Sequence, residues 1–184
     1  MSINTVVGID LSMTCPAMCV HTGETWQLSN CKFFYLTSRK KSIIHIDQFT
    51  GELHSDFNSP EERFDSITKF LIDNIPVKAT VAIEGYSFAS TGSRIFQIGE
   101  LCGVLKHKLY RFGFDFITPP PSKIKKLASN FGNASKIQMD TAFQRETGID
   151  ISKIVNCGIG DSPSSDVIDS FYLAKCVFLY CNHR

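Results

Sequence analysis

Two short apolar runs that each end in a carboxylate constrain the fold more than any other feature of this sequence. Residues 5–10 read Thr-Val-Val-Gly-Ile-Asp, and residues 79–84 read Ala-Thr-Val-Ala-Ile-Glu. Short β-branched runs of this kind are typical of buried strands. Open α/β sheets build their sites from side chains at the carboxyl ends of strands. The two runs therefore predict a sheet that delivers Asp10 and Glu84 to a common site.

The other segments predict an α/β fold in which helices cover both faces of a mixed sheet. Two further strands, expected at residues 17–21 and 25–36, would join the first strand in an antiparallel meander. Helices are expected over residues 59–74, 94–111, 122–130, 135–147 and 162–181, and a short strand over residues 114–118. Residues 42–58 fit either another strand or an elaborated loop. The 184 residues are expected to form a single domain, residues 1–184, with a sheet of about five strands.

Charge, cysteine content and hydropathy narrow the class of protein. Nineteen Lys and Arg residues oppose 18 Asp and Glu residues, so any nucleic-acid contact must come from local basic clusters beside an acidic site. Seven cysteines without a CxxC pair argue against a disulfide framework or a zinc ribbon and favour a reducing compartment. The sequence contains neither a secretion signal nor an apolar run of about 18 residues. We therefore expect a cytoplasmic protein without a membrane contact.

Two more carboxylates, Asp166 and Asp169, lie three residues apart near the start of the last expected helix and so share one face. Taken singly, Asp10 could be a turn residue and the helix acids could complement the helix dipole. Together with Glu84, they form the kind of oxygen donor set that Mg²⁺ takes in sites that act on phosphodiesters, with Mn²⁺ able to substitute. Without a cation, their mutual repulsion should raise some of their pKa values. The combination therefore predicts a magnesium-dependent phosphodiesterase site.

The order and spacing of these segments resemble the catalytic segments of RuvC-type Holliday junction resolvases, which have the RNase H-like fold. The matching stretches are Val7-Gly8-Ile9-Asp10, Ala82-Ile83-Glu84, residues 98–104, residues 132–136 and Asp166-Val167-Ile168-Asp169. The resemblance covers essentially the whole chain. It implies that the four acids bind metal and that the family's basic residues correspond to Lys125 and Lys136, with Lys136 taking part in catalysis. It also implies a homodimer that acts on four-way junctions in a bacterial or phage-infected cell.

Two departures from the family pattern indicate a divergent branch and are compatible with a phage-encoded protein. The family commonly has Pro-Gly after its first Asp, whereas this chain has Leu11-Ser12, so we expect a reshaped turn there. Residues 37–60 form an insertion relative to the family. Both departures leave the preferred substrate open.

The candidate DNA contacts combine aromatic and basic side chains. Tyr86 and Phe88 follow Glu84 in a Gly- and Ser-rich loop, where an exposed aromatic could stack on an unpaired base, although either ring could instead be buried. The lysines that bracket two short helices could contact phosphates or form a solvated face; they are Lys123, Lys125, Lys126 and Lys136. Gly99 and Gly103 would let a neighbour approach their helix closely, as internal packing or as a dimer seam.

We therefore expect a nuclease that resolves Holliday junctions by paired nicks, in which water attacks and the 3′-hydroxyl leaves. Three alternatives stay open at this point. The same site could debranch flaps and forks in general, or the protein could bind branched DNA without cutting it. Residues 8–14 faintly resemble the first phosphate loop of actin-like and sugar-kinase ATPases, but that class needs two lobes and a second such loop. A chain of 184 residues has room for neither.

Overall fold

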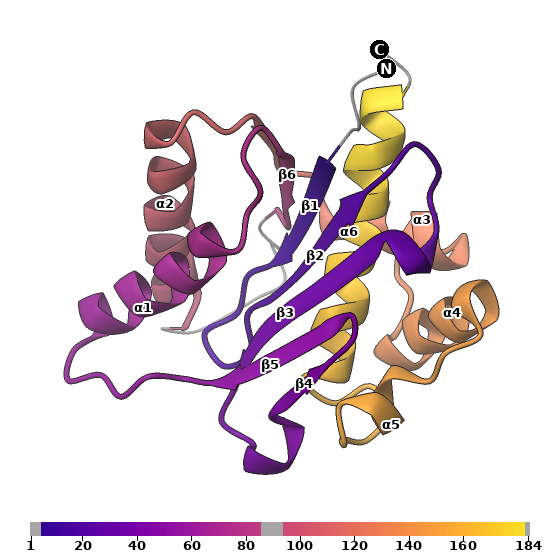
Figure 1. Ribbon diagram of the computed structural model, residues 1–184, viewed down its shortest axis with the longest axis horizontal. Helices are drawn as coiled ribbons and strands as arrows, with labels where there is room; N and C mark the ends of the chain where they lie inside the picture. Colours follow the sequence, from indigo (N-terminus) through magenta and orange to yellow (C-terminus); the bar gives the residue numbers. More distant parts are fainter. Residues whose placement is uncertain (1–4, 86–93, 183–184) are drawn as a thin grey trace.

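A computed structural model describes residues 5–85 and 94–182 and places a seven-stranded sheet at the centre of the molecule (Figure 1). In spatial order the strands are β4, β5, β3, β2, β1, β6 and β7. Their bounds are β1 Thr5–Asp10, β2 Ala17–Thr22, β3 Cys31–Thr37, β4 Ile44–Ile46, β5 Phe49–Leu53, β6 Thr80–Ile83 and β7 Phe116–Ile117. The two edge strands, β4 and β7, are the shortest, with three and two residues.

The expected antiparallel meander is confirmed, because β2 pairs antiparallel with both β1 and β3. On its other side β1 pairs in parallel with β6, with Ile9 opposite Ile83. The strands β1, β3 and β6 therefore run in one direction, and their carboxyl ends meet at one edge of the sheet. Asp10 ends the first of them, and Glu84 follows the last.

The expected number of strands was too low, because the open segment 42–58 contributes β4 and β5. β5 pairs in parallel with β3, and β4 pairs antiparallel with β5. Phe49 stacks on Phe33 with ring centroids 4.8 Å apart. A Cβ added to Gly51 would lie 2.3 Å from the ring of Tyr35, so glycine lets that ring pack over β5. These contacts are tertiary, and the local sequence alternates too irregularly to predict them.

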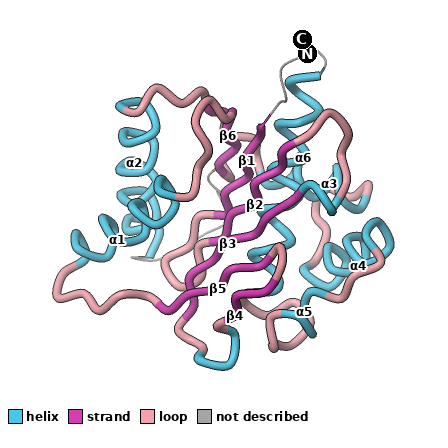
Figure 2. The backbone as a smooth tube through the Cα atoms, viewed as in Figure 1, coloured by secondary structure: helices cyan, strands magenta, loops and turns pink. Residues whose placement is uncertain are grey.

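Helices cover both faces of the sheet, as expected (Figures 1 and 2). One face carries α1 (Pro60–Asp73) and α2 (Arg94–Arg111), and the other carries α3 (Pro121–Ser129), α4 (Lys136–Thr147), α5 (Ile151–Ile154) and α6 (Ser164–Asn182). The short α5 lies inside residues 148–162, which we expected to be a loop. Alternation along β1 separates the two cores: Val7 and Ile9 pack with α1 and α2, whereas Val6 packs with α6.

Helix α6 lies directly against β1 because residue 8 is glycine. A Cβ at Gly8 would lie 2.1 Å from the backbone nitrogen of Ala174 and 2.2 Å from the carbonyl oxygen of Ser170. Such distances leave no room for any side chain, so the two backbones are in direct contact. This contact fixes the first turns of α6 beside the carboxyl end of β1.

None of the helices within the described ranges combines the length and apolar composition that crossing a bilayer requires. All seven cysteines are free thiols in this structure.

Candidate active site

The four predicted acids come together at the edge where β1 and β6 end. Asp10 is the last residue of β1, Glu84 follows β6, and Asp166 and Asp169 lie in the first turns of α6. Asp10 and Asp166 are only 9% and 8% exposed, and the other two are half-buried. Asp10 interacts by charge with each of the other three. Four carboxylates from three separate elements therefore share one buried cluster.

Burial and mutual repulsion raise the pKa of every acid in this cluster. Burial is the largest cause for Asp10, followed by repulsion from Asp166, Asp169 and Glu84. Burial raises the pKa of Asp169 to about 7, with Glu84 and Asp166 adding to the effect. The pKa values of Glu84 and Asp166 also lie above their usual range, chiefly through burial. The expected repulsion is therefore present, but loss of solvation contributes more.

Two of the four predicted lysines face this cluster. The Nζ of Lys136, at the start of α4, donates to the Oγ of Ser165 at 3.1 Å. Its charge lowers the pKa values of Asp10, Asp166 and Asp169, against the effect of burial. Lys125 from α3 has the same effect on Glu84 and Asp169. The acid cluster therefore has a cation on each of two neighbouring helices.

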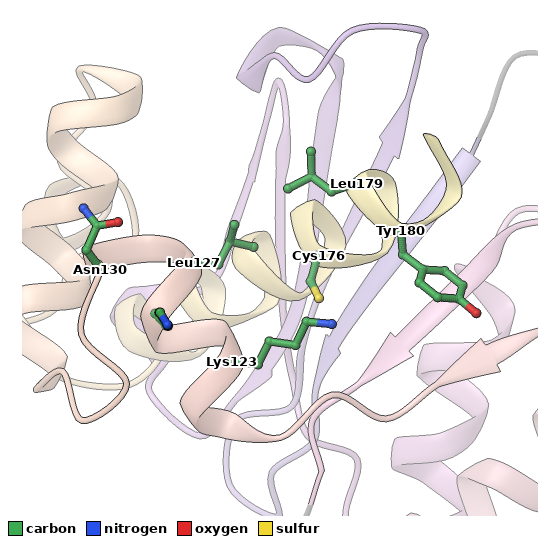
Figure 3. Close-up of a pocket in the computed structure, with 7 residues that line it drawn as sticks. Lys123, Leu127, Asn130, Cys176, Leu179 and Tyr180 are labelled. Atoms are coloured by element: carbon green, nitrogen blue, oxygen red, sulfur yellow. The ribbon is translucent and has the colours of Figure 1, made fainter. Parts of the chain in front are cut away.

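The other two lysines, Lys123 and Lys126, lie elsewhere. They line a cavity of about 570 Å³ between α3 and the second half of α6, together with Leu127, Asn130, Cys176, Leu179 and Tyr180 (Figure 3). Cys176 comes seven residues after Asp169, which is roughly 10 Å along a helix axis. The structure thus divides the predicted basic set into one pair at the acids and one pair at this cavity.

The turn after Asp10 supplies contacts that the sequence did not predict. The hydroxyl of Ser12 accepts from the backbone N–H groups of Thr14 and Cys15, both at 3.2 Å. The turn brings the Cys15 thiol close to the Asp166 carboxylate, and both Cys15 and Ser162 lower the pKa of Asp166, against the larger effect of burial. The available signal for this turn was Ser12, because serine side chains often accept hydrogen bonds from backbone N–H groups in turns. The partnership with Asp166 spans 151 residues of chain and left no local signal.

The insertion and α1 hold the same turn from outside. The His54 ring makes a hydrogen bond of 2.9 Å with the carbonyl oxygen of Thr14, and the Arg63 guanidinium donates to that of Met13. Both partners come from segments that the site prediction left out. They fix the loop that borders Asp10.

The donor chemistry of the cluster fits a hard divalent cation. The Oδ2 atom of Asp166 is buried and has no hydrogen-bond partner among the described residues. Within those residues no group of three or more His, Cys, Asp or Glu side chains is placed so that it could hold a metal ion. Mg²⁺ does not need one, because it is usually held by one or two carboxylates together with water and substrate phosphate. An open set of carboxylates with an orphan oxygen suits that mode of binding.

The remaining expectations concern two aromatic residues after Glu84 and two glycines of helix α2. Tyr86 and Phe88 lie outside the described residues. Gly99 and Gly103 lie on α2, and a Cβ added to either would meet no atom within 4 Å. The described residues therefore do not pack closely against these two glycines, and the dimer seam stays a prediction.

Neither a protein-family profile nor a curated protein matches the sequence. Solved structures do match. The Thermus thermophilus RuvC structure is 17% identical with a TM-score of 0.61, over 97% of this chain and 96% of that chain. The T. thermophilus RuvC in complex with Holliday junction substrate is 17% identical with a TM-score of 0.62, over 98% and 96%. The Fowlpox virus resolvase with its substrate Holliday junction DNA is 18% identical with a TM-score of 0.47, over 95% and 99%.

The fold of this chain is thus the RNase H-like fold of RuvC, which confirms the fold that the motifs predicted.

Proposed function

We propose that this protein is a metal-dependent, structure-specific endonuclease that resolves Holliday junctions and related branched DNA by paired nicks. The observation that carries the proposal is the buried cluster of four carboxylates with two lysines beside it. The RuvC-like fold supports the same reading, since one of the similar structures is RuvC with a Holliday junction substrate. A site of this composition is suited to a phosphodiester, which brings negative charge and oxygen ligands.

In this proposal Asp10, Glu84, Asp166 and Asp169 hold Mg²⁺, for which Mn²⁺ can substitute. Bound ions of this kind activate water and stabilise negative charge on the phosphate. The raised pKa values mean that the carboxylates need a cation to stay ionised together at neutral pH. Their burial keeps bulk water out of the site and strengthens each electrostatic contact there.

The chain's own cations have the complementary task of holding the scissile phosphate. Lys136 and Lys125 approach the acids from two helices, so together they can neutralise charge that builds up on phosphate oxygens. A water oxygen attacks phosphorus and the bond to the 3′ oxygen breaks. The products are a 5′-phosphate and a 3′-hydroxyl. The hydrogen bond from Lys136 to Ser165 fixes the position of this ammonium group.

Paired nicks call for two active sites, and α2 offers a surface for a second copy. Phe96 and Tyr110 are 72% and 75% exposed, and they lie seven residues to either side of Gly103 on one face of α2. With Gly99, this face joins aromatic side chains to two positions of open backbone. We infer a symmetric homodimer across it. Gly103→Leu should convert the dimer to a monomer in analytical ultracentrifugation, and a Gly103→Leu protein that stays dimeric would rule this seam out.

Opening a crossover requires contact with unpaired bases, and we propose Phe88, with Tyr86 as second candidate, for this task. Stacking on one base contributes about 1 to 3 kcal/mol. Phe88→Ala should reduce junction cleavage several-fold and weaken the fluorescence of a base analogue at the crossover. Loss of thermal stability with normal unstacking would identify Phe88 as a core residue instead.

The decisive experiment compares four-way, flap and linear DNA, each with Mg²⁺, with Mn²⁺ and with EDTA. We expect symmetric nicks in the four-way junction, only with metal, and little cutting of the linear duplex. Faster cutting of flaps than of junctions would favour a general debranching nuclease. Tight junction binding without cutting under any condition would favour a non-catalytic binding protein.

A further inference from the structure

The inserted segment begins with a basic loop, Arg39-Lys40-Lys41, which is displayed at the surface from a buried anchor. It includes the 3₁₀ turn η2 (Lys40–Ser42), which lies between β3 and β4. Ser42 is fully buried, and its carbonyl oxygen accepts a hydrogen bond of 2.6 Å from the Tyr35 hydroxyl. The three basic side chains are exposed. The loop is therefore a fixed part of the surface.

The basic loop is also tied to the chain that leads into α6. The side-chain amide of Asn156 donates to the carbonyl oxygen of Lys41 at 3.1 Å. The guanidinium of Arg39 lies 3.6 Å from the Asp161 carboxylate. These two contacts join segments more than 100 residues apart in sequence. They place the loop against residues 156–161.

This position adjoins the acid cluster. β3 runs parallel to β1, and Tyr35 is in register with Ala17, which pairs with Asp10. The basic loop thus follows β3 at the edge where the acids gather. On the far side of residues 156–161, a Cβ on Gly160 would lie 3.4 Å from the Cβ of Lys136. One short segment therefore separates the loop from the lysine at the acids.

The cations here are available to an outside anion. Arg39 and Lys153 have carboxylate partners, Asp161 at 3.6 Å and Asp150 at 3.2 Å. Both cations are solvent-exposed, and ion pairs made by such cations contribute little. For Lys40 and Lys41 the described residues include no carboxylate within ion-pair distance.

A hollow of about 620 Å³ lies at this place. It is bordered by Lys41, Ser152, Lys153, Asn156 and Cys157. Lysine, serine and asparagine are the side chains that proteins use to contact phosphate and sugar.

We propose that the basic loop binds the phosphate backbone of a duplex arm that leaves the acid cluster, an assignment that rests on the proposed function. The loop lies at the same edge of the sheet as the acids, and residues 156–161 lie between it and Lys136. A strand held at the acids would therefore continue over residues 156–161 toward Lys40 and Lys41. The contacts reach only phosphates and are therefore independent of base sequence. The insertion thus extends the DNA surface of the RuvC-like fold on the side of β3.

The test compares two double variants with the same loss of charge, Lys40→Gln/Lys41→Gln and Lys32→Gln/Lys78→Gln. The control lysines are exposed and lie at the amino ends of β3 and β6, at the opposite edge of the sheet. Junction affinity is measured in EDTA over a range of KCl concentrations. Each lost phosphate contact should reduce the slope of log affinity against log salt by about 0.9. The loop variant should lose up to about 1.8 in slope and on the order of tenfold in affinity, while the control keeps the wild-type slope.

Cleavage at saturating protein separates this inference from the proposed function. The loop variant should cut bound junctions at the wild-type rate, because the acids and Lys136 are unchanged, and should keep the wild-type melting temperature. Equal slopes for the two double variants, with a wild-type protein that binds and cuts junctions, would overturn the inference and leave the function standing. A wild-type protein that neither binds nor cuts branched DNA would overturn both.

Discussion

The two longest helices, α6 and α2, meet the rest of the molecule in opposite ways, and glycine marks the difference in each. Gly8 of β1 lets α6 approach so closely that a Cβ would overlap its backbone, whereas a Cβ on Gly99 or Gly103 of α2 would meet no atom. Helix α6 is buried along most of its length, and α2 exposes Phe96 and Tyr110. The helix that carries catalytic candidates is held rigidly by the sheet. The helix with the two open glycines leaves this face uncovered by the described residues.

The largest expected effect tests whether the acid cluster, which β1 and the closely packed α6 bring together, serves catalysis. Asp10→Asn should reduce junction cleavage by at least about a thousandfold and leave junction binding largely intact, because the oxygen donors change while the phosphate contacts remain. Without metal the variant should also melt at a higher temperature, since a buried carboxylate with a raised pKa is replaced by a neutral amide. Gel-based cleavage and thermal melting in EDTA measure both effects. Near-normal turnover with reduced stability would make Asp10 a structural residue.

The glycine contrast itself is tested by adding one methyl group at each position. Gly8→Ala should destabilise the fold by about 3 kcal/mol or more, because the new Cβ overlaps backbone that cannot move aside cheaply. Gly103→Ala should instead stabilise the isolated helix by up to about 1 kcal/mol. Urea unfolding of the two variants gives the comparison. A tolerated Gly8→Ala would mean that α6 can shift along the sheet.

A third prediction contrasts the pair of lysines beside the first turns of α6 with the pair beside its second half. Lys125→Gln and Lys136→Gln should each lower single-turnover cleavage by about tenfold or more, since these cations face the acids. Lys123→Gln and Lys126→Gln should leave that rate unchanged, and any effect should be confined to affinity and its salt dependence. Cleavage at saturating protein, set against binding titrations, separates the two. Equal losses of rate in both pairs would show that the cavity between α3 and α6 is part of the active site.

The smallest expected effect concerns His21 of β2, which packs against the second half of α6. His21 is fully buried between Trp26 and Phe178, with ring centroids 4.6 and 5.0 Å away, and burial lowers its pKa. The unfolded chain therefore takes up a proton first, and stability should fall by about 1 kcal/mol as the pH drops below about 6.5. His21→Phe removes this titration and should flatten the curve. The measurement is the melting temperature of the wild type and of His21→Phe from pH 7.5 to 5. Parallel curves for the two proteins would show that His21 does not cause the loss of stability.

The placement of the acids could be predicted because it depends on local patterns. Apolar runs define β1 and β6, parallel strands end at one edge, and a spacing of three puts Asp166 and Asp169 on one helix face. The sequence also contained the information needed to divide the lysines into two pairs. Lys123 and Lys126 are three residues apart on α3, so they share a face that Lys125 does not.

What the sequence could not show depends on contacts between distant segments. The strands β4 and β5 are fixed by Phe33 and Tyr35 of another strand. The effect of Cys15 on the pKa of Asp166 follows from a turn and a helix end that the fold brings together. The basic loop had a visible charge pattern. Its position in the fold became clear only from its contacts with Asn156 and Asp161, which lie in the segment that leads into α6.

The short edge strands have a consequence for how the protein behaves at high concentration. A long, flat edge strand offers unpaired N–H and C=O groups to any passing chain and so invites sheet-to-sheet aggregation. Here the sheet ends in three residues at β4 and in two at β7. Neither stretch is long enough to template another strand, so the protein can accumulate without its sheets joining edge to edge.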